Sequence, residues 1–180
     1  MNVVHLAYAG LGGHGSVLFS LLEGGFLRKA NHFIIFFGIE DVRPEYVDRC
    51  RRLNVRWYYV PVKSKWRYAE FVLKLYINLK KINPRVVLSH GVAPVPSLVL
   101  LKALGKVFVV IRDTQAIDLK TRRELYYLNL SHYMFDHIVY LTVDAQQRAA
   151  KKLFLYRARA ESSVIGNGLD TDYFSSHQEC

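Results

Sequence analysis

The chain has 180 residues, of which 51% are hydrophobic and 22% charged, and it carries a formal net charge of +10. That apolar fraction excludes intrinsic disorder, while only 11 glycines and 5 prolines exclude a collagen-like or low-complexity chain. The length indicates about one globular domain. Two cysteines, Cys50 and Cys180, are too few for a disulfide framework or a four-ligand zinc site, which indicates a reducing compartment.

Short apolar runs alternate with helical patterns along the whole chain. In chain order the pattern predicts strand 2–9, helix 16–29, strand 32–37, helix 44–53, strand 55–62, helix 65–82, strand 85–89, helix 96–104, strand 107–111, helix 119–135, strand 137–141, helix 144–156 and strand 163–165. Parallel strands need crossover connections, and helices supply them. The expected fold class is therefore α/β: a doubly wound, mostly parallel Rossmann-like sheet of about seven strands with helices on both faces.

The segment Gly10-Leu11-Gly12-Gly13-His14-Gly15 follows the first predicted strand and precedes a helix. It satisfies the pattern G-x-G-x-x-G, in which backbone amides and the helix N-terminus form a seat for a phosphate group. A nicotinamide-cofactor site would also need an acid after the second strand, and Glu40 and Asp41 are the nearest candidates. Alternatively, the glycines serve only a tight, closely packed turn.

Polar residues also end two later strands: His90 closes one, and Arg112 with Asp113 closes the next. Because this fold places ligands at the carboxyl ends of its strands, these side chains are candidates to bind a sugar, phosphate or carboxylate. Alternatively, Arg112 and Asp113 pair with each other or cap the following loop. The remaining histidines show no metal-ligand spacing, and no nucleophile or paired-carboxylate signature is present, so no metal site and no catalytic residue is predicted.

The positive charge is concentrated in residues 43–85. Twelve bases against three acids give this segment +9, which leaves +1 of the total of +10 for the rest of the chain. Within it, Arg67, Lys74 and Lys81 recur at heptad spacing on the predicted helix 65–82, next to Trp66. Interleaved bases and aromatics are typical of a membrane-docking face and of single-stranded nucleic-acid binding, while a solvated helix face is the simpler interpretation.

The N-terminal residues lack the basic region and long apolar run of a signal peptide. The most apolar stretch, residues 96–111, is interrupted by Lys102, Gly105 and Lys106, which argues against a membrane span. We therefore expect a cytoplasmic protein.

Two segments together resemble family 4 (group 1) glycosyltransferases of the GT-B fold. The strand followed by Gly10–Gly15 resembles the opening of that family. Residues 137–142 and then Asn167-Gly168-Leu169-Asp170, with Phe174 shortly after, resemble its closing motif, a hydrophobic strand followed by Asn-Gly-Val-Asp and a phenylalanine. The resemblance spans essentially the whole chain.

This resemblance implies that residues 1–174 are an N-terminal, acceptor-side domain and residues 175–180 the start of a linker or tail. A C-terminal donor-binding domain would be absent, since the family's Glu-x7-Glu segment has no counterpart here. The intact enzyme would transfer a sugar from a nucleotide-sugar to an acceptor hydroxyl, with retention, without an obligatory metal or a resident cofactor. The isolated domain would be inactive.

By the same resemblance, Gly12 and Gly13 contact the donor diphosphate, and His14, His90, Arg112 and Asp113 are candidate acceptor-binding residues. Family members commonly have histidine where Arg112 stands, so catalytic-histidine chemistry does not transfer simply to this chain. The basic face with Arg67, Lys74, Lys81 and Trp66 would dock on an anionic membrane at the inner face of the cell membrane, presenting a lipid-linked or phosphorylated acceptor.

Two other functional classes stay open at this stage. One is an NAD(P)-binding domain of an oxidoreductase, built on the glycine loop. The other is a nucleic-acid-binding module acting through residues 43–85, although no recognised RNA- or DNA-binding signature supports it.

Overall fold

The computed structural model describes residues 1–10, 13–24, 30–62 and 67–166, with the backbone alone at residues 13 and 14. The strands are β1 (Asn2–Tyr8), β2 (Asn31–Gly38), β3 (Arg56–Pro61), β4 (Val86–His90), β5 (Phe108–Asp113), β6 (His137–Tyr140) and β7 (Glu161–Val164). The helices are α1 (Gly13–Glu23), α2 (Pro44–Arg52), α3 (Tyr68–Ile82), α4 (Val95–Leu104), α5 (Arg122–Met134) and α6 (Val143–Lys152). A short 3-10 helix covers Ile117–Leu119.

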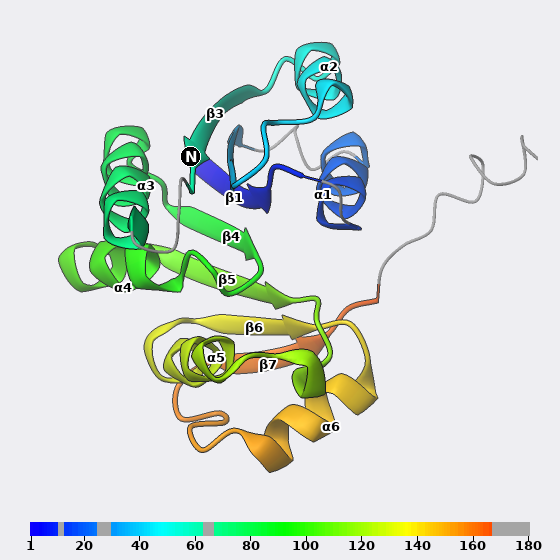
Figure 1. The fold of residues 1–180 in the computed structure, drawn as a ribbon, viewed down its shortest axis with the longest axis vertical. Coiled ribbons are helices and arrows are strands. Elements are labelled where there is room, and N and C mark those ends of the chain that lie inside the picture. The colour runs from blue at the N-terminus through cyan, green and yellow to red at the C-terminus, as the bar shows by residue number, and fades with distance from the viewer. Residues whose placement is uncertain (11–12, 25–29, 63–66, 167–180) are drawn as a thin grey trace, which may run out of the picture.

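The seven strands form one sheet in the order β3-β2-β1-β4-β5-β6-β7, and every pairing in it is parallel. Each strand is therefore linked to the next by a crossover, and all carboxyl ends lie at one edge of the sheet. The expected doubly wound α/β fold is confirmed (Figure 1).

Helices pack on both faces of the sheet, but they are distributed unequally (Figure 1). The larger apolar cluster joins one face of the sheet to α3, α4, α5 and α6, with Phe71, Leu75 and Leu98 among its fully or nearly fully buried members. The smaller cluster joins the other face to α1 and α2, and its sheet residues come from β1 and β2. Alternating side chains on each strand divide the sheet residues between these two clusters.

Three predicted helix boundaries were wrong. The helix expected at residue 16 begins at Gly13. The helix expected at residue 119 begins at Arg122, because Thr121 and Glu124 form a capping box. The Thr121 hydroxyl accepts from the Glu124 amide at 3.3 Å, and the Glu124 carboxylate accepts from the Thr121 amide at 2.8 Å. The helix expected to reach residue 156 ends at Lys152, where Leu153 adopts an extended conformation.

The predicted start of the helix 65–82 and the predicted end of the helix 16–29 lie outside the described residues. No helix of the described ranges is long and apolar enough to span a bilayer.

Burial on α3 predicts a sharp contrast between two leucines two residues apart. Leu75 is fully buried against the sheet, whereas Leu73 is 55% exposed. Leu75→Ala should lower the free energy of unfolding by about 2–5 kcal/mol, because a cavity forms in the core. The matched change Leu73→Ala should alter it by less than about 0.5 kcal/mol. Urea denaturation measures both values, and equal losses would contradict the assigned face of α3.

Candidate functional site

The strand order changes direction at β1, which lies between β2 and β4. The chain leaves β1 toward one side through α1 and later reaches β4 through α3 on the other face, so a crevice forms at the strands' carboxyl ends. A cavity of about 540 Å³ opens there. Its polar lining residues are Tyr8, His90, Asp113, Thr114, Gln115, Lys120 and Glu124.

A second cavity, of about 370 Å³, adjoins the first and shares residues 113–116 with it. It continues along the same edge to the end of β6, where Thr142, Asp144 and Arg148 line it. The Arg148 side chain pairs with Asp144 at 2.8 Å and with Asp118 at 3.0 Å. We call the two cavities together the strand-end groove.

Asp113 and Lys120 form a buried ion pair on the wall of this groove. Lys120 Nζ donates to Asp113 Oδ1 at 2.6 Å, and the two side chains are 1% and 4% exposed. Burial raises the pKa of the Asp113 carboxyl, and the Lys120 charge opposes that shift. Because a buried charge without a partner is costly, each member of the pair holds the other in position.

Glu124 adds a second acidic group to the groove. Burial alone would raise the pKa of Glu124, but hydrogen bonds from the Thr121 hydroxyl and amide lower it below its usual range. The groove therefore presents the Glu124 carboxylate and the Gln115 amide to a ligand, with the Asp113–Lys120 pair buried in its wall. Such a set suits a ligand with several hydroxyl groups, because hydroxyls both donate and accept hydrogen bonds.

His90 is buried at the end of β4, where it borders the first cavity and stacks on His5 with ring centroids 6.3 Å apart. His5 in turn makes an Nε2···Nδ1 hydrogen bond of 2.9 Å with His32. Burial, and secondarily His32, lowers the pKa of His5 to about 3, so the His5 ring is neutral at physiological pH. His90 therefore belongs to a row of three histidines on the α1 side of the sheet.

Arg112 lies on the opposite face of β5 from Asp113, because successive strand residues alternate between faces. It is 5% exposed and borders a different cavity, between α1 and β4–β6. The alternative that Arg112 and Asp113 pair with each other is therefore wrong: Lys120 pairs with Asp113. The structure brings His90 and Asp113 together at the strand-end groove and separates Arg112 from it.

The glycine loop is described in part. Gly12 lies outside the described residues, and Gly13 begins α1, whose first amides face the carboxyl edge of the sheet; the His14 side chain is not described. A Cβ on Gly10 would collide with Tyr8 and Glu40, and one on Gly15 would collide with the Tyr46 ring. Close packing thus requires glycine at both ends of the motif.

The basic stripe on α3 is partly neutralised. Glu70 pairs with Arg67 and with Lys74, both at 2.6 Å. Lys80 and Lys81 make no ion pair within the described ranges, and Trp66 lies outside them. Of the bases in the predicted face, Lys81 is therefore the one without an ion pair among the described residues. Lys80, which the prediction did not include, is a second such lysine beside it.

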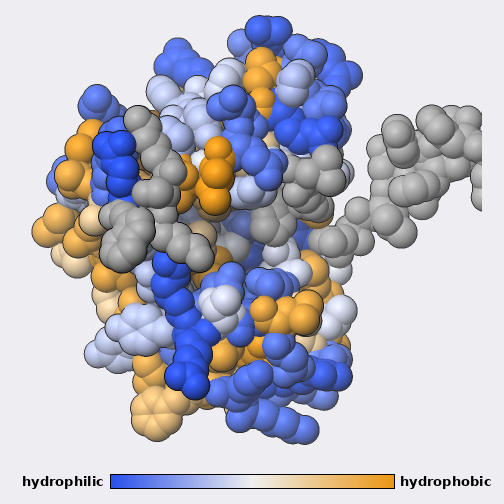
Figure 2. Space-filling view, viewed as in Figure 1, coloured by the Kyte–Doolittle hydropathy of each residue, from blue (hydrophilic) through white to orange (hydrophobic). Residues whose placement is uncertain are grey.

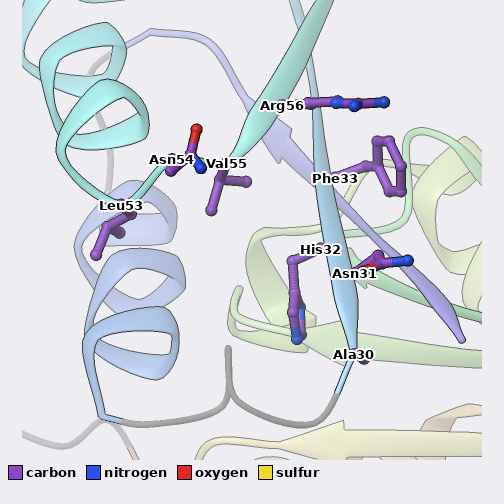
Figure 3. A pocket seen from close by; sticks show the side chains of 8 residues that line it. All are labelled: Ala30, Asn31, His32, Phe33, Leu53, Asn54, Val55 and Arg56. Atoms are coloured by element: carbon purple, nitrogen blue, oxygen red, sulfur yellow. The ribbon is translucent and has the colours of Figure 1, made fainter.

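A further cavity, of about 440 Å³, lies at the opposite edge of the sheet, where β2 and β3 begin (Figure 3). His32 lies on the same side of β2 as Leu53 and Val55, and Asn31 and Phe33 point to the other side (Figure 3). This cavity is remote from the strand ends that carry the candidate residues, and we do not assign it to the site.

Lys120 is the main site residue that the sequence did not predict. It lies seven positions after Asp113 in a loop, and no periodicity links the two residues. Thr121 and Glu124 could have been found, because Thr-x-x-Glu before a helix is the signature of a capping box.

The buried pair yields a test by substitution. Lys120→Met should lower the free energy of unfolding at pH 7 by about 3–5 kcal/mol, because Asp113 is left buried without its partner. Burial raises the folded-state pKa of Asp113 above its ordinary value of 3.8. The loss of unfolding free energy should therefore be small near pH 3.8, grow as the pH rises toward the folded-state pKa, and level off above it.

The control is the double variant Asp113→Leu with Lys120→Met, which removes both charges. In the same urea titrations, its free energy of unfolding should be close to that of the wild-type protein. A double variant as unstable as Lys120→Met alone would contradict the proposed cause.

No family model matches this sequence, and no curated protein matches it. Solved structures do. Anabaena Alr3699/HepE in complex with UDP and glucose aligns with a TM-score of 0.72 at 11% identity, over 96% of this chain and 46% of that chain. The lipopolysaccharide outer core galactosyltransferase WaaB aligns with 0.71 at 16%, over 94% and 46%. UDP-N-acetylglucosamine 2-epimerase from Rickettsia bellii aligns with 0.63 at 16%, over 98% and 48%.

The chain thus spans about half the length of these structures. At these identities the likeness establishes a shared fold. Because the similar structures include glycosyltransferases, it supports the GT-B fold that the sequence resemblance implied.

Proposed function

We propose that this chain is the N-terminal, acceptor-binding domain of a retaining GT-B glycosyltransferase of family 4, with residues 175–180 beginning the link to a C-terminal donor-binding domain. The intact enzyme transfers a sugar from a nucleotide-sugar to an acceptor hydroxyl, and the isolated domain is inactive. The observation that carries the proposal is the strand-end groove, a hydroxyl-binding set of side chains at the switch point of a fold shared with a UDP-bound structure.

In this proposal the two sides of the site have different tasks. Glu124 and Gln115 orient the acceptor, since the carboxylate accepts from its hydroxyls and the amide both donates and accepts, while the buried Asp113–Lys120 pair fixes the wall beneath them. Gly12 and Gly13 present amides at the start of α1 to the donor diphosphate, where the helix dipole favours the charge that develops as it departs. Neither a metal nor a resident cofactor is part of the proposal.

The glycine loop tests donor binding in the protein that carries the C-terminal domain. Gly13→Asp places a carboxylate at the N-terminus of α1, where it favours the helix but repels a diphosphate. We expect the KM for the nucleotide-sugar to rise at least about tenfold, with the melting temperature unchanged. Gly105→Ala, at the end of α4 and remote from the strand ends, is the control. Unchanged donor kinetics in Gly13→Asp would contradict the proposed contact.

One observation favours the nicotinamide-dependent oxidoreductase as a second candidate. The Glu40 side chain lies against Gly10 and accepts a hydrogen bond from the Tyr8 hydroxyl at 3.2 Å, near the place where an acid would bind a ribose. Isothermal titration separates the two functions: micromolar NAD(P) binding without a response to UDP- or GDP-sugars would favour the oxidoreductase.

We also propose that the outer surface of α3 and α4 docks on an anionic membrane and brings a lipid-linked or phosphorylated acceptor to the groove. On α3, Leu73 and Ile77 are exposed, with Lys80 and Lys81 on the same helix. On α4, Leu100 and Leu104 are exposed, and Leu104 shares a small cavity with Lys80. Hydrophobic residues gather at the left edge of the molecule, over α3 and α4 (Figure 2). Apolar residues edged by lysines are typical of interfacial helices.

Vesicle co-sedimentation at low salt tests this surface. Wild-type protein should pellet with phosphatidylglycerol vesicles and stay in solution with phosphatidylcholine vesicles, and the variant Lys80→Glu with Lys81→Glu should lose most of the binding. Arg51→Glu with Arg52→Glu makes the same charge change on α2 and should retain more of it. Equal loss in both variants would show that net charge alone attracts the protein. Binding to oligonucleotides of equal strength would instead favour a nucleic-acid partner.

A further inference from the structure

A cavity of about 430 Å³ lies on the α1 side of the sheet, away from the strand-end groove. Val17, Ser20 and Leu21 of α1 form one wall, and Leu88, Val110 and Val139 of three neighbouring strands form the floor. Both faces of a parallel sheet are normally covered by helices. Here the smaller apolar cluster takes its sheet residues from β1 and β2, so the floor over β4–β6 stays accessible beside α1.

The walls of this cavity are mostly apolar; its polar side chains are His5 and Arg112, which are buried, and Ser20, which is exposed. Arg112 is the one charged residue among those that line it within the described ranges, and it is 5% exposed. A guanidinium group has five N–H donors, so it can bind an incoming anion while keeping other contacts. The volume, the aliphatic lining and the single cation together match a site for a small amphiphile.

His5 supplies an independent sign of a ligand. Its side chain is fully buried and lines the same cavity, and its Nε2 atom is engaged with His32 at 2.9 Å. Its other ring nitrogen, Nδ1, has no hydrogen-bond partner among the described residues. A buried nitrogen left without a partner costs free energy, and a polar ligand group in the cavity would satisfy it.

We propose that this cavity binds a single-chain anionic amphiphile, with its hydrocarbon chain between α1 and the strands β4–β6 and its acidic head group at Arg112 and His5. Charge complementarity selects the anionic head, because the lining residues that the structure describes include a cation and no acid. Aliphatic walls select the chain. The proposal is independent of glycosyl transfer, since the cavity and the strand-end groove lie on different faces of β5.

Isothermal titration with dodecyl phosphate, below its critical micelle concentration, tests the site on the full chain. We expect saturable 1:1 binding. Inorganic phosphate, which lacks the chain, and dodecyltrimethylammonium, which carries the opposite charge, should bind at least about tenfold more weakly. Comparable binding of the cationic amphiphile would overturn the assignment of Arg112 to the head group.

Two kinds of variant locate the ligand. Val110→Trp fills the floor of the cavity and Leu21→Trp its rim, so both should abolish binding, whereas Val143→Trp, exposed on α6, should not affect it. Arg112→Met should weaken binding by about 10- to 100-fold and leave dodecyltrimethylammonium unaffected. Because Leu21 is 37% exposed, its variant keeps the test decisive if Val110→Trp fails to fold.

Two results would overturn the proposal. The first is undiminished dodecyl phosphate binding in the folded tryptophan variants. The second is a wild-type dimer in analytical ultracentrifugation that Leu21→Trp converts to monomer, since a second copy of the chain would then cover this face.

Discussion

A parallel sheet needs a crossover after every strand and cover on both faces, and these two requirements organise the whole molecule. The crossovers bring every strand end to one edge, so that residues far apart in sequence, such as Tyr8, His90 and Asp113, border one cavity. The cover is unequal, because α3 to α6 share one face while α1 and α2 pack over the first strands of the other. The strand-end groove therefore results from the crossovers. The apolar cavity beside α1 results from the incomplete helical cover on its face of the sheet.

Charge is handled differently inside the fold and on its surface. In the interior, Asp113 is neutralised by Lys120, and burial keeps His5 and His132 uncharged by lowering their pKa values to about 3 and about 4. On the surface of α3, Glu70 offsets Arg67 and Lys74, which narrows the effective basic area to the end of the helix. The formal charge of residues 43–85 is therefore larger than the unpaired positive charge that a binding partner would contact.

Much of the fold was predictable because its strands are short, apolar and separated by helical periodicity. All seven strands and six helices were expected close to their observed positions. The errors fell at element ends: α1 begins at Gly13 and not at residue 16, β7 covers Glu161–Val164 and not 163–165, and Thr121 and Leu153 decide the boundaries of α5 and α6. The edge of the sheet at which the candidate site lies was also predictable, since the fold class places ligands at strand ends. Which side chains meet there was less so. Lys120 was not predicted, because it reaches Asp113 through the conformation of a loop, which no periodic sequence pattern indicates.

By itself the sequence determined the fold class, the edge of the sheet that carries the candidate site and the residues available there, because hydrophobic periodicity and glycine placement are local properties of the chain. Only the tertiary structure decided how those residues are divided. Alternation along β5 sends Asp113 to the groove and Arg112 to the cavity beside α1, whereas His90, which is in register with Arg112, borders the groove from the end of β4. Such assignments depend on contacts between distant segments, and no local pattern encodes them.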